Sequence, residues 1–199
     1  MEKLPLLIVL TGKTASGKDT IKLTLLKNYP NLKKVITTTS RIPRDNEKDG
    51  KDYHFLTRSE FEQKIKDNIF AEFVEYGGNL YGTQKIELEQ ALENDTLWKI
   101  DPSRAGEVRD FIKRSFPAKL AKELIKRVVV IYINALDEAI LERLQRRNLS
   151  EDEIIKRMVD DKKIWDQYKN SYDFVIENET NQLRETLLKI EQIINNHKS

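Results

Sequence analysis

The chain has 199 residues, which is enough for one α/β domain with a sizeable core. Charged residues make up 34% of it, but 35 Lys and Arg against 33 Asp and Glu leave a formal net charge of only +2. This balance excludes a strongly basic nucleic-acid binder and an acidic disordered tail, and the absence of cysteine excludes a disulfide scaffold, a thiolate metal site and a cysteine nucleophile.

Short apolar runs alternate with charged amphipathic stretches along the chain. In chain order, the pattern predicts a strand at 6–10, a helix at 18–28, a strand opening at 35–36, a helix at 84–94, strands at 96–100 and 127–134, helices at 137–148 and 150–169, a strand at 174–177 and a helix at 181–197. Such β-α alternation with buried strands implies a mostly parallel sheet that helices cover on both faces.

Two stretches interrupt this alternation. Between 36 and 83, turn residues separate two short strands, at 52–56 and 70–76, which flank a helix at 59–67, and we interpret this stretch as an inserted subdomain. The stretch 115–127 is predicted to be an extra charged helical turn.

The strongest local motif is Gly12-Lys13-Thr14-Ala15-Ser16-Gly17-Lys18, which has the spacing G-x-x-x-x-G-K between a predicted strand and a predicted helix. Glycines let successive backbone N–H groups point inward at phosphate oxygens, and the helix N-terminus adds its positive dipole end. Lys18 supplies a mobile cation for the β- and γ-phosphates. The motif predicts a loop that holds ATP.

The position after this lysine departs from the motif, which usually has a Ser or Thr whose hydroxyl binds Mg²⁺. Here it is Asp19, and the hydroxyl comes one residue later, at Thr20. Asp19 either suits the first turn of the helix, where a carboxylate complements the dipole, or it touches the metal directly or through water.

A second group of motifs follows. Two arginines, Arg41 and Arg44, lie three apart on a Pro-stiffened loop and suit a dianionic phosphate, because guanidinium groups bind its oxygens bidentately. The motifs read Thr37-Thr38-Thr39-Ser40-Arg41-Ile42-Pro43-Arg44, then Asp49-Gly50-Lys51-Asp52-Tyr53-His54-Phe55, then Phe70-Ala71-Glu72, then Gly78-Asn79-Leu80-Tyr81-Gly82-Thr83. In this order and spacing they resemble the guanylate kinase family, and the resemblance runs from the phosphate loop to Asn178.

The resemblance implies an α/β P-loop kinase, in which helices flank a parallel sheet and the chain adds a GMP-binding subdomain and a helical lid. The expected divisions of this single guanylate kinase-like domain, 1–199, are a core at 1–35, 84–136 and 157–199, a nucleoside-monophosphate-binding subdomain at 36–83 and a lid at 137–156.

The resemblance also implies roles for GMP-binding residues. Arg41, Arg44, Tyr53 and Tyr81 would hold the GMP phosphate, Thr37 and Thr83 would meet the carbonyl side of the base, and Asp101 would also lie at the GMP. Glu72 would accept hydrogen bonds from guanine N1–H and the exocyclic amine. The chemistry agrees independently, since guanine presents two adjacent donors that a carboxylate matches, whereas adenine presents an acceptor at N1.

The strand before Asp101 resembles the family's strand ending D-x-D, but Lys99 replaces the first acid. Asp101 would either hold Mg²⁺ through water or cap the segment that begins at Pro102. Lys99 would either pair with a phosphate or weaken GMP binding. A charge exchange between Asp19 and Lys99, one acid gained and one lost, is a further hypothesis.

The stretch from 141 to 157 looks like the family's lid, with Arg143, Arg147 and Arg157 at the positions of its phosphate-binding arginines. Ser150 and Glu153 form a predicted capping box that starts a helix, and we expect Arg146 to pair with a glutamate on a solvated face. Asn178 would sit near the adenine.

We therefore expect an enzyme that transfers the γ-phosphate of ATP to GMP, and to dGMP, with Mg²⁺ as cofactor. Lys18, Arg44, Arg143 and Arg157 would bear the catalytic charge; the loop 12–20, Arg147 and Asn178 would bind ATP. Two alternatives stay open: a kinase for another nucleoside monophosphate, and a non-catalytic guanylate-kinase-like binding module.

The longest apolar run, residues 4–10, is too short to span a bilayer, and it starts within three residues of Met1 without a small-residue cleavage site. We expect a cytoplasmic monomer or homodimer whose partners are the small nucleotides ATP and GMP, with no nucleic-acid or membrane partner.

Overall fold

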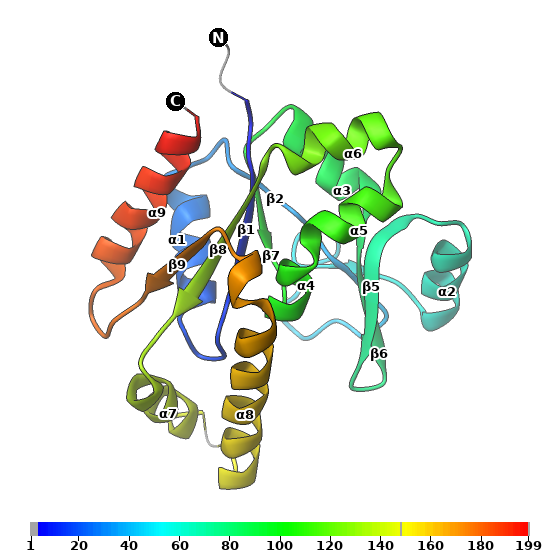
Figure 1. Cartoon of the computed structure of the whole chain (residues 1–199). Helices are drawn as coiled ribbons and strands as arrows, with labels where there is room; N and C mark the ends of the chain where they lie inside the picture. The colour runs from blue at the N-terminus through cyan, green and yellow to red at the C-terminus, as the bar shows by residue number, and fades with distance from the viewer. Residues whose placement is uncertain (1–3, 148, 199) are drawn as a thin grey trace.

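The computed structural model describes residues 4–147 and 149–198 and has a parallel five-stranded sheet at its centre (Figure 1). The strand order is β2-β7-β1-β8-β9, and every neighbouring pair is parallel. The bounds are β1 Leu7–Gly12, β2 Lys33–Lys34, β7 Thr96–Lys99, β8 Val128–Asn134 and β9 Phe174–Glu177. The predicted α/β fold with a parallel core is confirmed.

Helices cover both faces of this sheet because successive side chains of a strand point to opposite sides. Leu6, Ile8 and Leu10 belong to the same buried cluster as residues of α1 (Lys18–Asn28) and α9 (Leu183–His197). Leu7 and Val9 belong to a second cluster, with residues of α4 (Pro102–Gly106), α5 (Val108–Ser115) and α6 (Ala118–Ile125). The six residues of β1 are therefore all buried, as the apolar run predicted.

A second sheet of four strands, in the order β4-β3-β6-β5, projects to one side of the first (Figure 1). Its strands are β3 Thr38–Thr39, β4 His54–Phe55, β5 Phe70–Tyr76 and β6 Asn79–Gln84, and α2 (Arg58–Lys66) packs on it through a cluster of Phe61, Phe70 and Leu80. This separate sheet coincides with the stretch in which the regular β-α alternation stops.

Two helices extend below the central sheet in Figure 1: α7 (Asp137–Gln145) and α8 (Glu151–Tyr168). The hydroxyl of Ser150 accepts a hydrogen bond from the backbone N–H of Glu153 at 3.3 Å, so the predicted N-cap is confirmed. The carboxylate of Glu153 accepts from Arg157 instead, so the reciprocal half of the predicted capping box is replaced by an ion pair. Asn148, the last residue of the helix predicted at 137–148, lies outside the described residues.

Most predicted elements are present, but the second strand was misplaced. It lies at Lys33–Lys34, because the N–H of Ile36 donates to the Glu87 carboxylate at 2.9 Å rather than to a neighbouring strand. The helix predicted at 84–94 is α3 (Lys85–Glu89) followed by a 3-10 turn, Gln90–Leu92.

Four of the strands and α-helices described have no counterpart in the prediction: β3, β6, α4 and α5. The stretch 115–127, expected to be one helical turn, contains the eight-residue helix α6, whose Ala121 and Leu124 are buried. These segments are short, and their apolar residues become buried only against neighbouring elements.

The strand order places a crevice at the carboxyl ends of the central strands. The chain passes from β1 to the edge strand β2, returns to β7 beside β1, and then continues on the other side of β1 with β8 and β9. In open parallel sheets ligands bind outside such a switch point, and here the segment that follows β1 is the glycine-containing loop. No helix in the described ranges is long and apolar enough to cross a membrane.

Candidate active site

The loop between β1 and α1 is shaped by two glycines. Gly12 has φ 143° and Gly17 has φ 94°, values that L side chains rarely adopt. A Cβ on Gly12 would collide with the backbone of Ile133, and one on Gly17 would collide with the amide nitrogen of Asn178. The loop between them therefore turns tightly, and α1 begins directly after it at Lys18.

The ammonium of Lys18 turns back over this loop. It donates to the carbonyl of Gly12 at 2.8 Å and also to that of Lys13. The pKa of Lys18 is lowered to about 8, mainly by burial; the negative charge of Asp161 opposes this shift, and the positive charge of Lys99 contributes to it. The loop thus holds a half-buried cation that is not fully neutralised, as an anion-binding site requires.

The carboxylate of Asp161, on α8, lies against the same loop, and sequence analysis did not predict this. Asp161 Oδ2 accepts a hydrogen bond from the backbone N–H of Thr14 at 2.8 Å, and Oδ1 lies 3.4 Å from the Thr14 hydroxyl. Burial raises the pKa of Asp161 despite these bonds. Arg157 and Asp161 are four residues apart on one helix, a spacing that places them on the same face and could have indicated this position.

Three further contacts brace the loop. Asn178 is buried, donates to the carbonyl of Ser16 at 2.7 Å and accepts from Thr186, so it supports the loop from behind. The ammonium of Lys13 pairs with Asp137 of α7 at 2.8 Å. Arg143, also on α7, donates to the carbonyl of Ala15 at 3.1 Å.

The other arginines of the predicted lid have different surroundings from Arg143. Arg157 is paired with Glu153 at 2.6 Å, and Arg147 is exposed just beyond the end of α7. Arg146 pairs with Glu142, as expected for a solvated helix face.

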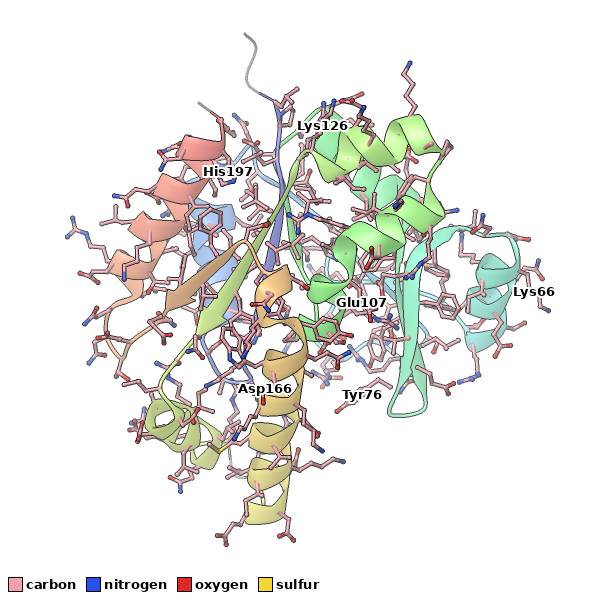
Figure 2. The ribbon with its side chains drawn as sticks, in the orientation of Figure 1. Lys66, Tyr76, Glu107, Lys126, Asp166 and His197 are labelled. Atoms are coloured by element: carbon pink, nitrogen blue, oxygen red, sulfur yellow. The ribbon has the colours of Figure 1, made fainter. Side chains whose placement is uncertain are left out.

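A cleft of about 600 Å³ joins this loop to the four-stranded sheet. Gly12 and Lys18 line it at the loop end, and Asp161 lies beside them. The other walls come from the second sheet and the segments beside it, from the end of β7 and from the start of α4; they include Thr37, Tyr53, Glu72, Tyr76, Tyr81, Lys99, Asp101 and Arg104. Tyr76, labelled in Figure 2, lies near the tip of the β5–β6 hairpin.

Glu72 is the buried acid of this wall, with a side chain only 7% exposed. Its Oε1 accepts a hydrogen bond from the hydroxyl of Thr83 at 2.8 Å, and its Oε2 lies 3.8 Å from Nε of Arg104. Burial raises the pKa of Glu72, while Thr83 and Arg104 favour the charged form. Such a carboxylate suits a ligand that presents paired N–H donors, since an acceptor there would leave it unmatched.

Arg104 was not singled out from the sequence. It donates to the carbonyl of Phe73 at 3.0 Å and lies 3.4 Å from Glu107, the residue labelled beside α4 in Figure 2. It therefore ties α4 to β5 and holds a positive charge beside Glu72.

The two predicted phosphate-binding arginines lie on the segment between β3 and β4. Arg41 donates to both carboxylate oxygens of Glu47 at 2.8 Å, and its guanidinium lies 5.6 Å from the centre of the Tyr53 ring. The backbone N–H of Arg44 also donates to Glu47, at 2.9 Å. The rings of Tyr53 and Tyr81 are 6.4 Å apart, and both line the cleft. Arg41 and Arg44 are not among the residues that line it: Arg41 lies behind Tyr53 in its pair with Glu47, and Arg44 is exposed.

The two departures from the motifs meet in space. Lys99 Nζ donates to Asp19 Oδ1 at 2.7 Å, and Lys22 lies 3.6 Å from the same oxygen. Burial acts to raise the pKa of Asp19, but the hydrogen bond and charge of Lys99 outweigh burial and lower it.

Asp101 and Thr20 both lie at the start of a helix and make local hydrogen bonds there. Asp101 caps α4: its Oδ1 accepts from the backbone N–H of Ser103 at 2.9 Å and from the Ser103 hydroxyl at 2.6 Å. The capping alternative for Asp101 is thus present in the structure. Thr20 is exposed in the first turn of α1, where its carbonyl accepts from the Thr24 hydroxyl.

Comparisons with known proteins cover almost the whole chain. A family model described as guanylate kinase matches residues 5–197. A guanylate kinase from Desulfitobacterium hafniense is 31% identical over 176 residues, which are 87% of this chain and 82% of the relative. A guanylate kinase from Rickettsia felis is 34% identical over 192 residues, 95% of this chain and 92% of the relative. The crystal structure of guanylate kinase from Anaplasma phagocytophilum matches with a TM-score of 0.70 and 26% identity, over 100% of this chain and 88% of that one.

Proposed function

The chain belongs to the guanylate kinase family, and from this premise we propose that it transfers the γ-phosphate of ATP to GMP, giving ADP and GDP. The observation that most strongly supports this function is the single cleft shared by the phosphate loop and the buried carboxylate of Glu72. One end suits a triphosphate, and the other suits a base with paired donors.

On the donor side, the loop 12–20 would wrap the phosphates of ATP. Its backbone N–H groups and the start of α1 provide fixed partial positive charge. Lys18 would exchange its bonds to the Gly12 and Lys13 carbonyls for phosphate oxygens. Arg143 already touches the loop, and Arg147 and Asn178 complete the proposed ATP site.

On the acceptor side, Arg41, Arg44, Tyr53 and Tyr81 would hold the phosphate of GMP. Glu72 would accept from the two guanine donors, and Thr37, Thr83 and Asp101 would complete that site. The hydrogen bond from Thr83 orients the Glu72 carboxylate, which makes this pocket pre-organised for guanine.

In the transfer step, an oxygen of the GMP phosphate attacks the γ-phosphorus while the bond to the β–γ bridging oxygen breaks and ADP leaves. Catalysis of this step is mainly alignment and charge stabilisation, so no general base is required. Lys18 and Arg44 would act from the core and the subdomain, and Arg143 and Arg157 from the proposed lid at 137–156. Closure of the lid would exclude water, which otherwise competes with GMP for the γ-phosphate.

Asp19 uses Oδ1 for its pairs with Lys99 and Lys22, and Asp101 uses Oδ1 to cap α4. The Oδ2 atoms of these two acids therefore suit a Mg²⁺ ion that arrives with the nucleotide. In the described part of the chain there is no group of three or more His, Asp or Glu that could hold a metal alone. Mg²⁺ commonly takes one or two carboxylates together with phosphate oxygens and water, and Asp19, with Asp101 through water, would provide these. When bound, the ion would neutralise charge on the transferred phosphate.

We propose that the enzyme acts as a monomer or a homodimer in the cytoplasm. Because the cleft lies within one chain, a monomer suffices and a homodimer is compatible with it. We place the enzyme in the cytoplasm because its proposed substrates are nucleotides found there.

A coupled assay of ADP release against GMP, dGMP, IMP, AMP and UMP tests the function. We expect GMP to give the highest kcat/KM, with dGMP second and AMP at least about 10³-fold lower, because AMP presents an acceptor to Glu72. A higher kcat/KM for AMP or UMP would indicate a different acceptor. Absence of ATP binding in calorimetry would indicate a non-catalytic module.

The lowered pKa of Lys18 predicts that ATP binding depends on pH. The ammonium is charged below about pH 8 and attracts the phosphates, whereas above it the free protein must first take up a proton. ATP affinity should therefore fall above about pH 8, by up to roughly tenfold per pH unit. Calorimetric titrations between about pH 7 and pH 9.5 measure this, and a flat profile would contradict the assignment.

Asp161 provides a second variant for this experiment. Its negative charge raises the pKa of Lys18, so Asp161→Asn should move the midpoint of the ATP-binding profile to lower pH. Asp160→Asn is the matched control, because Asp160 is the exposed neighbour on the same helix and should leave the midpoint unchanged. Equal midpoints for all three proteins would show that Asp161 does not act on Lys18.

A further inference from the structure

The lysine at the end of β7 has no role in the function proposed above. We propose that Lys99 binds the phosphate of the acceptor nucleotide, and that Asp19 positions its ammonium for this contact. The inference rests on the proposed function, since it concerns the acceptor end of the same cleft.

The placement of Lys99 follows from the sheet register. Lys99 pairs with Leu10 across the parallel β7–β1 ladder, so its side chain leaves the sheet at the edge where the phosphate loop begins. It lines the cleft together with Lys18 and with the two tyrosines Tyr53 and Tyr81. A cation there lies between the donor loop and the acceptor wall.

Asp19 holds the ammonium without saturating it. The Lys99 Nζ to Asp19 Oδ1 hydrogen bond, 2.7 Å long, uses one of the three N–H donors of an ammonium. The Lys99 side chain is 35% exposed and lines the cleft, and among the described residues Asp19 is the one hydrogen-bond partner of its ammonium. Lys99 can therefore keep Asp19 and add a phosphate oxygen.

The charges around Asp19 also favour an anion. Two lysines, Lys99 and Lys22, pair with the same oxygen of this carboxylate. Lys18 interacts electrostatically with both Lys99 and Asp19. Burial lowers the pKa of Lys22, and the positive charge of Lys99 lowers it further, so the lysines repel one another. A phosphate placed beside Lys99 would relieve this repulsion.

A purely structural alternative is that Lys99 only neutralises Asp19. Removing Lys99 would then weaken GMP binding by exposing the repulsive Asp19 carboxylate to the phosphate. The double variant Lys99→Met with Asp19→Asn separates the two explanations, because it removes that carboxylate charge as well.

The test is calorimetric titration of GMP and of guanosine, which lacks the phosphate, into each variant without ATP. Lys99→Met should weaken GMP binding by about 10- to 100-fold, the effect of losing one charge-assisted hydrogen bond. Guanosine affinity should stay within about twofold of wild type, because guanosine presents no phosphate to Lys99. The double variant should bind GMP with the same low affinity as Lys99→Met. Lys99→Arg should retain most of the wild-type affinity for GMP.

Lys22→Met is the matched control, since Lys22 approaches the same Asp19 oxygen but does not line the cleft, and it should leave GMP affinity within about twofold. Recovery of GMP affinity in the double variant, or equal losses for GMP and guanosine, would overturn the inference. Failure of the wild-type protein to bind or phosphorylate GMP would instead overturn the proposed function.

Discussion

Lys18→Ala is expected to lower kcat for GMP phosphorylation by about 10³-fold, because its ammonium is the half-buried cation of the phosphate loop. The side chain reaches back across the loop to the Gly12 carbonyl, so it lies where the β- and γ-phosphates of ATP would enter. Negative charge shifts toward the β–γ bridging oxygen during transfer, and a fixed cation beside it stabilises the transition state more than the ground state. Steady-state kinetics with saturating ATP and GMP measure the loss.

Lys27→Ala is the matched control for this variant. Lys27 lies in the last turn of the same helix and is exposed, so its removal should change kcat by less than about twofold. Thermal melting of both variants by circular dichroism reports on the fold. A kcat for Lys18→Ala near that of wild type would refute the donor-site assignment.

Glu72→Gln is expected to lower kcat/KM for GMP by about 10²- to 10³-fold. The amide of glutamine retains one acceptor oxygen but turns an NH₂ donor toward guanine, so one of the two base hydrogen bonds becomes a donor–donor clash. The loss is large because Glu72 is buried and held by Thr83, so the amide cannot turn to water. Most of the change should appear in KM for GMP, with KM for ATP within about threefold of wild type.

Glu75→Gln, on the same strand, is the control for Glu72. Glu75 is 53% exposed and pairs with Arg58, so losing its charge should change kcat/KM for GMP by less than about twofold. AMP adds a second readout, since the glutamine variant should discriminate less between GMP and AMP. An unchanged GMP-to-AMP ratio would remove Glu72 from the base-binding site.

Parts of the site were predictable because their residues are close together in the sequence. The phosphate loop is one run of seven residues whose glycine spacing already determines its shape, and Arg41 and Arg44 are three apart on one segment. The parallel sheet was likewise predictable, because its strands are apolar runs separated by amphipathic helices.

Short elements with few apolar residues escaped prediction for a physical reason. β6 contains Asn79 and Gly82 and resembles a turn, yet it pairs with both β3 and β5. The residues of α4–α6 form no long periodic stretch, and they become helical against the central sheet, where Val108, Ile112 and Leu124 are fully buried. Tertiary packing, more than local propensity, stabilises helices of this length.

From the residues alone, the chain predicts a loop for phosphates, a carboxylate for a base with paired donors and a set of arginines for a dianion. Only the tertiary structure showed which charges meet. Lys99 and Asp19 are 80 residues apart in the chain, and Thr14 and Asp161 are 147 apart, yet each pair is hydrogen bonded. Such pairs depend on strand order and helix placement, because a charge acts on its neighbours in space, whereas a sequence motif records only neighbours along the chain.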